Sequence, residues 1–296
     1  MKRLLLGVGA LIIAGGGVAF SLAQGPGVEP RDLSGLVGDP DRGVYVARLG
    51  GCVACHTDAK NGGAVLAGGG PIKTDFGTFF GPNITPHAED GVGSWTLEEF
   101  AAAMTAGEAP DGSSYYPVFP YDHYTRMTDQ DIVDLWVGIR TVPAVAGQAA
   151  KHDLRFPFSL RYAAGFWRSL FLDQGEFEPL VEEDPIDARG RYLAEGPGHC
   201  GACHSPRNVL GGVDHRNAYG GGEGPGGEKI PAISQAALSE NGWTEADIAY
   251  ALRTGVTLSG DVFGGSMAEV MRDGTQFWGD EDRHAVGRYP LQLFDP

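Results

Sequence analysis

Apolar positions recur at intervals of three and four residues in short stretches of the chain, and long polar or glycine-rich loops separate these stretches. The pattern predicts a first helix that begins at Asp39 or Asp41, since either carboxylate can cap it. A second helix is expected to begin after Thr96 and to end at Gly107, and a third to begin after Thr128. The apolar face of the third helix consists of Ile132, Leu135, Trp136 and Ile139. No stretch alternates convincingly with the period of a strand, so we expect an all-α fold with long loops.

The second half of the chain repeats this pattern. The paired segments are 41–47 with 188–194, 94–100 with 242–248, and 128–131 with 279–282. Trp95 lies 43 residues after Cys52, and Trp243 lies 43 residues after Cys200. Such spacing indicates an internal duplication. We therefore expect two tandem domains of one kind, at residues 40–150 and 186–296.

The first 24 residues have the composition of a targeting segment. After Lys2 and Arg3 they carry no charge, and Ser21-Leu22-Ala23 offers a cleavage site of the small-x-small type. These features are typical of a signal peptide, although the apolar stretch is also long enough to span a bilayer and favours an uncleaved anchor. Either interpretation predicts export from the cytoplasm. Residues 25–39 are rich in glycine and proline and are expected to form a tether.

Residues 151–185 connect the two predicted domains and are unusually aromatic for a linker. The aromatic segments are 155–160 and 166–171. One interpretation is that they pack between the domains. The other is that they form an exposed docking strip for a partner subunit or the membrane surface.

The four cysteines of the chain all lie in two copies of one motif, C-x-x-C-H. The copies are Cys52-Val53-Ala54-Cys55-His56 and Cys200-Gly201-Ala202-Cys203-His204. In an exported protein this motif indicates c-type haem attachment, because two thiols at this spacing can each add to a haem vinyl group. The adjacent histidine then binds the iron as an axial ligand. Zinc would need a second Cys/His pair, and a dithiol redox pair would not require the histidine.

Composition and charge agree with two covalently bound haems. Glycine accounts for 47 of the 296 residues, so much of the chain is loop and its apolar core is small for its length. A porphyrin buried in each half would supply the missing apolar mass. The formal net charge of −16 argues against nucleic acid or anionic lipid as a partner surface.

A low-spin haem needs a second axial ligand, which is usually a methionine sulfur or a histidine nitrogen. In the second half Met267 lies 63 residues after His204, in a sequence that predicts a loop able to cover the far side of the haem. We expect Met267 rather than Met271 to be this ligand.

The motifs and their surroundings resemble the cytochrome c subunits of bacterial membrane-bound periplasmic dehydrogenases, of the alcohol and gluconate dehydrogenase type. The related cytochromes that accompany molybdenum hydroxylases are also similar. The resemblance is carried by segments 50–52, 76–78, 82–86, 95–96, 116–117, 120–121 and 198–208. It implies that Arg207 holds a haem propionate and supports Met267 as an axial ligand. Those subunits usually carry three haems, whereas this chain has two motifs.

The first half departs from that family at the expected axial methionine. The family has Tyr-Pro-Ala-Met-Pro-Tyr, whereas residues 116–121 of this chain place Phe119 at the methionine position. Phenylalanine cannot bind iron, so three possibilities stay open. His123 is the ligand and gives a bis-histidine haem of lower potential, Met127 is the ligand, or the iron is five-coordinate.

These features predict a dihaem electron carrier on the periplasmic side of the inner membrane, or in the soluble periplasm if the chain is cleaved after Ala23. Its donor would be a periplasmic dehydrogenase, and its acceptor a quinone, an oxidase or a soluble cytochrome of the respiratory chain. In this interpretation the chain is a non-catalytic subunit of an oxidoreductase complex. The alternative is a peroxidase-like haem enzyme, which would use a five-coordinate first haem.

Overall fold

The structure is a computed structural model that describes residues 25–224 and 227–292. The predicted signal peptide or anchor, residues 1–24, lies outside the described residues. Within the part that is described, none of the helices combines the length and the apolar character needed to cross a bilayer.

The three helices predicted for the first half form where the capping residues place them. They are α2 (Pro40–Leu49), α4 (Leu97–Ala106) and α6 (Asp129–Ile139). The Asp39 carboxylate accepts the first free N–H groups of α2, and Thr96 forms a capping box with Glu99 at the start of α4. Gly107 ends α4 in the left-handed conformation, with φ at 63°. Thr128 caps α6 as predicted.

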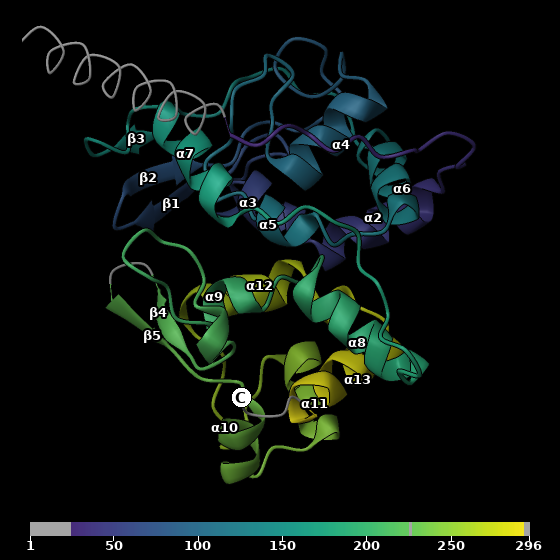
Figure 1. Cartoon of the computed structure of the whole chain (residues 1–296), viewed down its shortest axis with the longest axis vertical. Coiled ribbons are helices and arrows are strands. Elements are labelled where there is room, and N and C mark those ends of the chain that lie inside the picture. Colours follow the sequence, from purple (N-terminus) through teal and green to yellow (C-terminus); the bar gives the residue numbers. More distant parts are fainter. Residues whose placement is uncertain (1–24, 225–226, 293–296) are drawn as a thin grey trace, which may run out of the picture.

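The second half contains helices at the corresponding positions (Figure 1). They are α8 (Pro185–Glu195), α11 (Glu245–Thr254) and α13 (Asp280–Arg288). Helix α2 packs on α6 and α8 packs on α13, and each contact is close because a glycine lies at the crossing. A Cβ atom on Gly43 would lie 1.8 Å from the Asp134 carbonyl oxygen, and one on Gly190 would lie 2.1 Å from that of Ala285. The same helix crossing therefore occurs in both halves.

Six further helices are described between these elements, and four of them have six residues or fewer. They are α3 (Cys52–His56), α5 (Tyr121–Tyr124), α7 (Tyr162–Phe171), α9 (Gly201–His204), α10 (Gln235–Glu240) and α12 (Gly265–Asp273).

The prediction of an all-α fold is wrong in one respect, because two small antiparallel sheets are present. The first joins β1 (Pro71–Thr74), β2 (Gly77–Phe80) and β3 (Asp153–Leu154) in that order, and the second pairs β4 (Gly222–Gly224) with β5 (Glu228–Ile230). Within the described ranges no strand exceeds four residues, so none is long enough to show alternation in the sequence.

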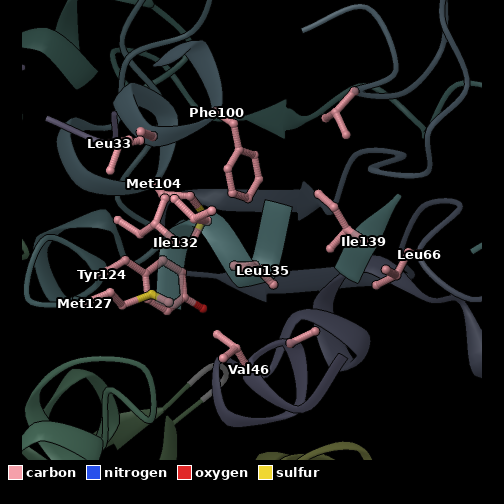
Figure 2. Close-up of a cluster of buried hydrophobic side chains, with 14 residues drawn as sticks. Leu33, Val46, Leu66, Phe100, Met104, Tyr124, Met127, Ile132, Leu135 and Ile139 are labelled. Atoms are coloured by element: carbon pink, nitrogen blue, oxygen red, sulfur yellow. The ribbon is translucent and has the colours of Figure 1, made fainter. Parts of the chain in front are cut away.

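The main core of the first half lies between α2, α4 and α6. It contains the predicted apolar face of α6 together with Val46, Phe100, Met104, Tyr124 and Met127 (Figure 2). A second cluster crosses between the halves, because Leu49 at the end of α2 packs with Tyr192, Leu193, Trp278 and Val286. The two halves are therefore joined by apolar packing as well as by the connector.

The connector forms α7, and its aromatic residues are partly buried and partly exposed. Trp167 is buried, and its ring packs on those of Tyr121 and Phe171. In contrast, Phe156 and Phe166 are exposed.

Candidate haem attachment sites

Each C-x-x-C-H motif forms a single helical turn, α3 in the first half and α9 in the second. Residues three apart on a helix lie on one side of it, so the two thiols of each motif share one side. The residue before each first cysteine has a positive φ, 64° at Gly51 and 38° at His199. This conformation lets the chain turn sharply from α2 or α8 into the motif.

Both motif histidines are held in the orientation that an iron ligand needs. Nδ1 of His56 lies 2.7 Å from the carbonyl oxygen of Pro82, and Nδ1 of His204 lies 2.9 Å from that of Pro231. A hydrogen bond from Nδ1 to a carbonyl fixes the tautomer and leaves the Nε2 lone pair free for a metal. Burial lowers the pKa of both rings, which favours the neutral form that binds iron.

The four thiols are free, and none is in a disulfide. Cys55 and Cys203 are exposed, yet the surrounding protein raises the pKa of Cys55 to about 11 and also raises that of Cys203. Burial raises the pKa of Cys52 and of Cys200 to about 12. A thiol that is open to solvent but surrounded by protein lies in a recess, as a group that faces a haem pocket would.

A glycine-lined hairpin packs directly on the first motif. Cβ atoms on Gly69 and Gly81 would lie 1.8 and 1.9 Å from the Cys55 carbonyl oxygen, so only glycine allows this approach. The amide of Gly68 also donates to the carbonyl of His56 over 2.9 Å. The second half repeats the contact, since the Gly221 amide donates to the carbonyl of His204 over 2.8 Å. Each motif is thus held by main-chain contacts and needs no side-chain support on that side.

The motif residues fit c-type haem and fit a zinc or dithiol site less well. Each set offers two thiols, one oriented imidazole and a recess. Across residues 25–224 and 227–292, no group of three or more His, Cys, Asp or Glu side chains is placed to hold a metal ion by itself. The two cysteines and the histidine of each motif would hold one haem, which would supply one-electron redox chemistry.

The two motifs lie close together at the contact between the halves, since Cε1 of His199 lies 3.7 Å from where a Cβ on Gly51 would be. A thiolate at Cys203 is near enough to raise the pKa of Cys55, after the larger effect of burial. Helix α12 of the second half contacts α3 of the first, and Nζ of Lys60 lies 3.3 Å from the carboxylate of Glu269 on α12. The attachment points of the two haems are therefore neighbours in the folded chain.

Reciprocal hydrogen bonds hold the halves in this arrangement. The hydroxyl of Tyr45 on α2 donates to Asp282 on α13 over 2.6 Å, and that of Tyr192 on α8 donates to Asp131 on α6. Tyr45 and Tyr192 occupy equivalent positions in the two halves, and so do the two aspartates. Residue pairs that exchange in this way are typical of a contact with approximate two-fold symmetry. Arg189 adds two bonds to Asp282, at 2.8 and 2.7 Å.

Met267 does not lie in a loop, as predicted, but in the first turn of α12. This helix begins at Gly265 after the N-cap Gly264, and Ser266 in its first turn donates to the Glu228 carboxylate. The loop that leads to α12 has a counterpart in the first half. The Phe263 amide donates to the Gly255 carbonyl, and the Tyr115 amide donates to the Gly107 carbonyl in the same way. Counted from these glycines, Met267 and Phe119 are both twelve residues on. Phe119 therefore occupies the position of Met267 in the repeat.

The two alternative ligands of the first half have different surroundings. The side chain of Met127 lies in the hydrophobic core and is not exposed at all (Figure 2). His123 lies at the contact between the halves, where Nδ1 is 3.0 Å from the carbonyl oxygen of Glu195. Its ring lies 6.3 Å from that of His199. Nδ1 is engaged as in His56, and Cε1 of the ring lies 3.6 Å from where a Cβ on Gly201 would be, so this side chain lies beside the second motif.

Arg207 braces the loop that follows the second motif. Its guanidinium donates to the carbonyl oxygens of Ala202, over 2.7 Å, and of Gly211, over 2.6 Å. Its positive charge lowers the pKa of Cys203 in part, against the larger effect of burial. The side chain thus lies beside the second motif, and its role as a propionate partner stays a prediction.

Sequence reasoning missed the reciprocal tyrosine–aspartate bonds and the place of His199. His199 packs its ring on that of Tyr124, at 5.5 Å between centroids, and lies beside Gly51 of the other motif. The sequence did contain a sign of the tyrosine–aspartate bonds. Tyr45 lies seven residues before Cys52, and Tyr192 lies eight residues before Cys200, so the two tyrosines are equivalent in the repeat.

The helical fold and the two oriented motifs define a cytochrome c with two covalently bound haems. No family model matches the chain. A dihaem c-type cytochrome of Cereibacter sphaeroides is 40% identical over 295 residues, which cover 98% of this chain and 97% of that protein. The chain belongs to this family of dihaem and dehydrogenase-associated cytochromes c, and it is an electron-transfer cytochrome.

Cytochrome c subunits of dehydrogenases are similarly close. That of a quinone-dependent alcohol dehydrogenase of Gluconobacter oxydans is 40% identical over 260 residues, which cover 84% of this chain and 53% of that subunit. That of gluconate 2-dehydrogenase of Pantoea cypripedii is 37% identical over 262 residues, which cover 85% of this chain and 59% of that subunit. The chain thus spans between half and two thirds of these subunits.

Proposed function

We propose that this cytochrome accepts single electrons from a dehydrogenase on the periplasmic side of the inner membrane and passes them to the respiratory chain. The acceptor would be a quinone, an oxidase or a soluble cytochrome. The observation that carries the proposal is the neighbourhood of the two motifs, with Cys55 near Cys203 and α12 against α3. The dehydrogenase partner is supported by the names of the relatives from Gluconobacter oxydans and Pantoea cypripedii.

The proposal divides the chain into two cytochrome c domains, residues 40–150 and 186–296, with residues 25–39 as tether and 151–185 as connector. Residues 1–24 would anchor the protein in the membrane. The repeat of helices, caps and helix crossings supports this division.

The axial ligands would differ between the domains. His56 and His123 would bind the first iron, and His204 and Met267 the second. The Nδ1 bonds of the three histidines and the equivalence of Met267 with Phe119 support this set. Because a thioether ligand raises the potential of a haem, the first site would have the lower potential and electrons would flow toward the second. Met127 is the weaker candidate, since binding would draw it out of the core.

The alternative function is a peroxidase-like enzyme with an open first iron, and it is favoured by the presence of Phe119 where the family has a methionine ligand. Carbon monoxide distinguishes this enzyme from an electron carrier, because it binds an open iron. It would be added to the reduced, haem-loaded protein. The proposal predicts no change in the absorption spectrum, because both irons are six-coordinate. A shift of about half of the haem absorbance would show one open iron and would favour the enzyme, and His123→Ala should produce that shift if His123 is the ligand.

A further inference from the structure

An apolar stripe runs along the outer face of α7. Tyr162, Phe166 and Leu170 are spaced four residues apart and therefore lie on one side of the helix, where they are 66%, 42% and 46% exposed. Phe156 and Leu160, in the turn before the helix, extend this surface and are 79% and 50% exposed. We call these five side chains the α7 face. So many large apolar side chains on one short segment are typical of a docking surface.

The opposite side of α7 is fixed to the protein. Arg168 is fully buried, donates to Ser114 and Glu108 over 3.1 Å each, and also donates to the carbonyl oxygen of Pro26. The helix therefore presents the α7 face outward in a defined orientation.

The described chain begins beside α7. Gly25 lies against the Arg168 guanidinium, and the Pro26 carbonyl accepts a hydrogen bond from it. Only Gln24 separates Gly25 from the uncharged segment that ends at Ala23, so the proposed anchor is adjacent in sequence to residues that contact this helix.

The local charge also suits a membrane surface, although the chain as a whole is acidic. Residues 151–172 contain four Lys and Arg residues and one Asp, whereas the whole chain has a net charge of −16. Lys151, Arg155 and Arg161 are exposed around the α7 face. Aromatic and aliphatic side chains bordered by basic ones are typical of segments that lie in the interface of a bilayer.

We propose that the α7 face lies in the headgroup region of the membrane and fixes the orientation of the two haem domains on it. The occupant is the lipid interface, and the proposal rests on the membrane location proposed above for residues 1–24. The protein would then contact the membrane at two places, the anchor and the α7 face. Two contacts would prevent it from rotating freely about its tether.

The test uses the full, haem-loaded chain reconstituted in vesicles of phosphatidylcholine, with and without phosphatidylglycerol. All four native cysteines are consumed by the haems, so a spin label on Phe166→Cys occupies the single free thiol. Tyr250→Cys is the matched control, because Tyr250 is a similarly exposed aromatic residue on α11 in the second half. The measurement is the accessibility of each label to oxygen and to a water-soluble nickel chelate, which gives its depth.

We expect the label at position 166 to lie about 5–10 Å below the headgroups, deeper with phosphatidylglycerol, and the label at 250 to remain in water. Equal exposure of both labels to the nickel chelate would overturn the proposal. So would a label at 166 that is in water in vesicles and becomes immobilised only when a dehydrogenase subunit is added, which would identify the α7 face as a protein interface. The depth of the label does not depend on the ligands of the two irons, which the carbon monoxide experiment tests separately.

Discussion

The reciprocal tyrosine–aspartate bonds offer a quantitative test of how the two halves are held together. Replacing Tyr192 with Phe removes one hydroxyl and leaves the ring packing unchanged. The hydroxyl is the partner that the described structure gives to Oδ2 of Asp131, while Oδ1 pairs with Arg42. Asp131 is 1% exposed, so water cannot replace the lost bond.

The two tyrosines should differ in their effect. A hydrogen bond to a charged group contributes about 1.5–3 kcal/mol, and leaving a buried charged acceptor unpaired adds to the loss. We therefore expect Tyr192→Phe to lower the free energy of unfolding by about 3 kcal/mol. Tyr45→Phe should cost only about 1 kcal/mol, because Arg189 still binds both oxygens of Asp282.

The assay is urea denaturation of the haem-loaded protein at neutral pH, with Tyr250→Phe as the control. Tyr250 is 57% exposed, so its change should stay within about 0.5 kcal/mol. Equal losses for Tyr192→Phe and Tyr45→Phe, or a loss for Tyr192→Phe no larger than that of the control, would refute the role assigned to these bonds.

Three further predictions concern the motif, the charges and the first haem. Gly81→Ala should destabilise the protein by about 3 kcal/mol or more and lower haem incorporation, because the added Cβ would meet the Cys55 carbonyl. The control is Gly27→Ala, where the added Cβ meets no other atom. It should have little effect in the same denaturation and haem-content assays. Although burial raises the pKa of Asp134, hydrogen bonds from the Asp39 amide, Arg42 and Gln130 lower it on balance. The contribution of Asp134 to stability should therefore be complete above the unfolded pKa of about 3.9 and be lost as the pH falls through the lower folded value. Urea midpoints measured against pH should show this loss. The Asp134→Asn variant should lose less stability over the same pH range. In a His123→Ala background, which removes the proposed sixth ligand, Phe119→Met should place a thioether at the position equivalent to Met267 and raise the midpoint potential of the first haem above its native value in a spectroelectrochemical titration. A carbon monoxide shift as large as that of His123→Ala alone would contradict that equivalence.

Local chemistry made part of this structure predictable. The C-x-x-C-H motifs fix the haem chemistry within five residues, and the caps at Asp39, Thr96 and Thr128 act within one turn, so both can be recognised in the sequence. The helical surroundings of Met267 were missed, because Glu228 and Ser266, which steady the start of α12, are 38 residues apart.

Features that depend on contacts between the halves could not be predicted. The Tyr192–Asp131 bond and the His123–Glu195 contact join segments separated by 61 and 72 residues. The two sheets also escaped prediction, since strands of two to four residues have no usable periodicity. The exposure of Phe166 and the burial of Trp167 follow from how α7 docks, which its aromatic composition alone does not determine.

The most direct test of the central claim is a spectroelectrochemical titration of the haem-loaded protein, before and after Met267→Ala. The account predicts two separate midpoints in the native protein, with the substitution lowering the higher one and leaving the lower one in place. A single midpoint shared by both haems, or a Met267→Ala variant in which only the lower midpoint moves, would contradict it.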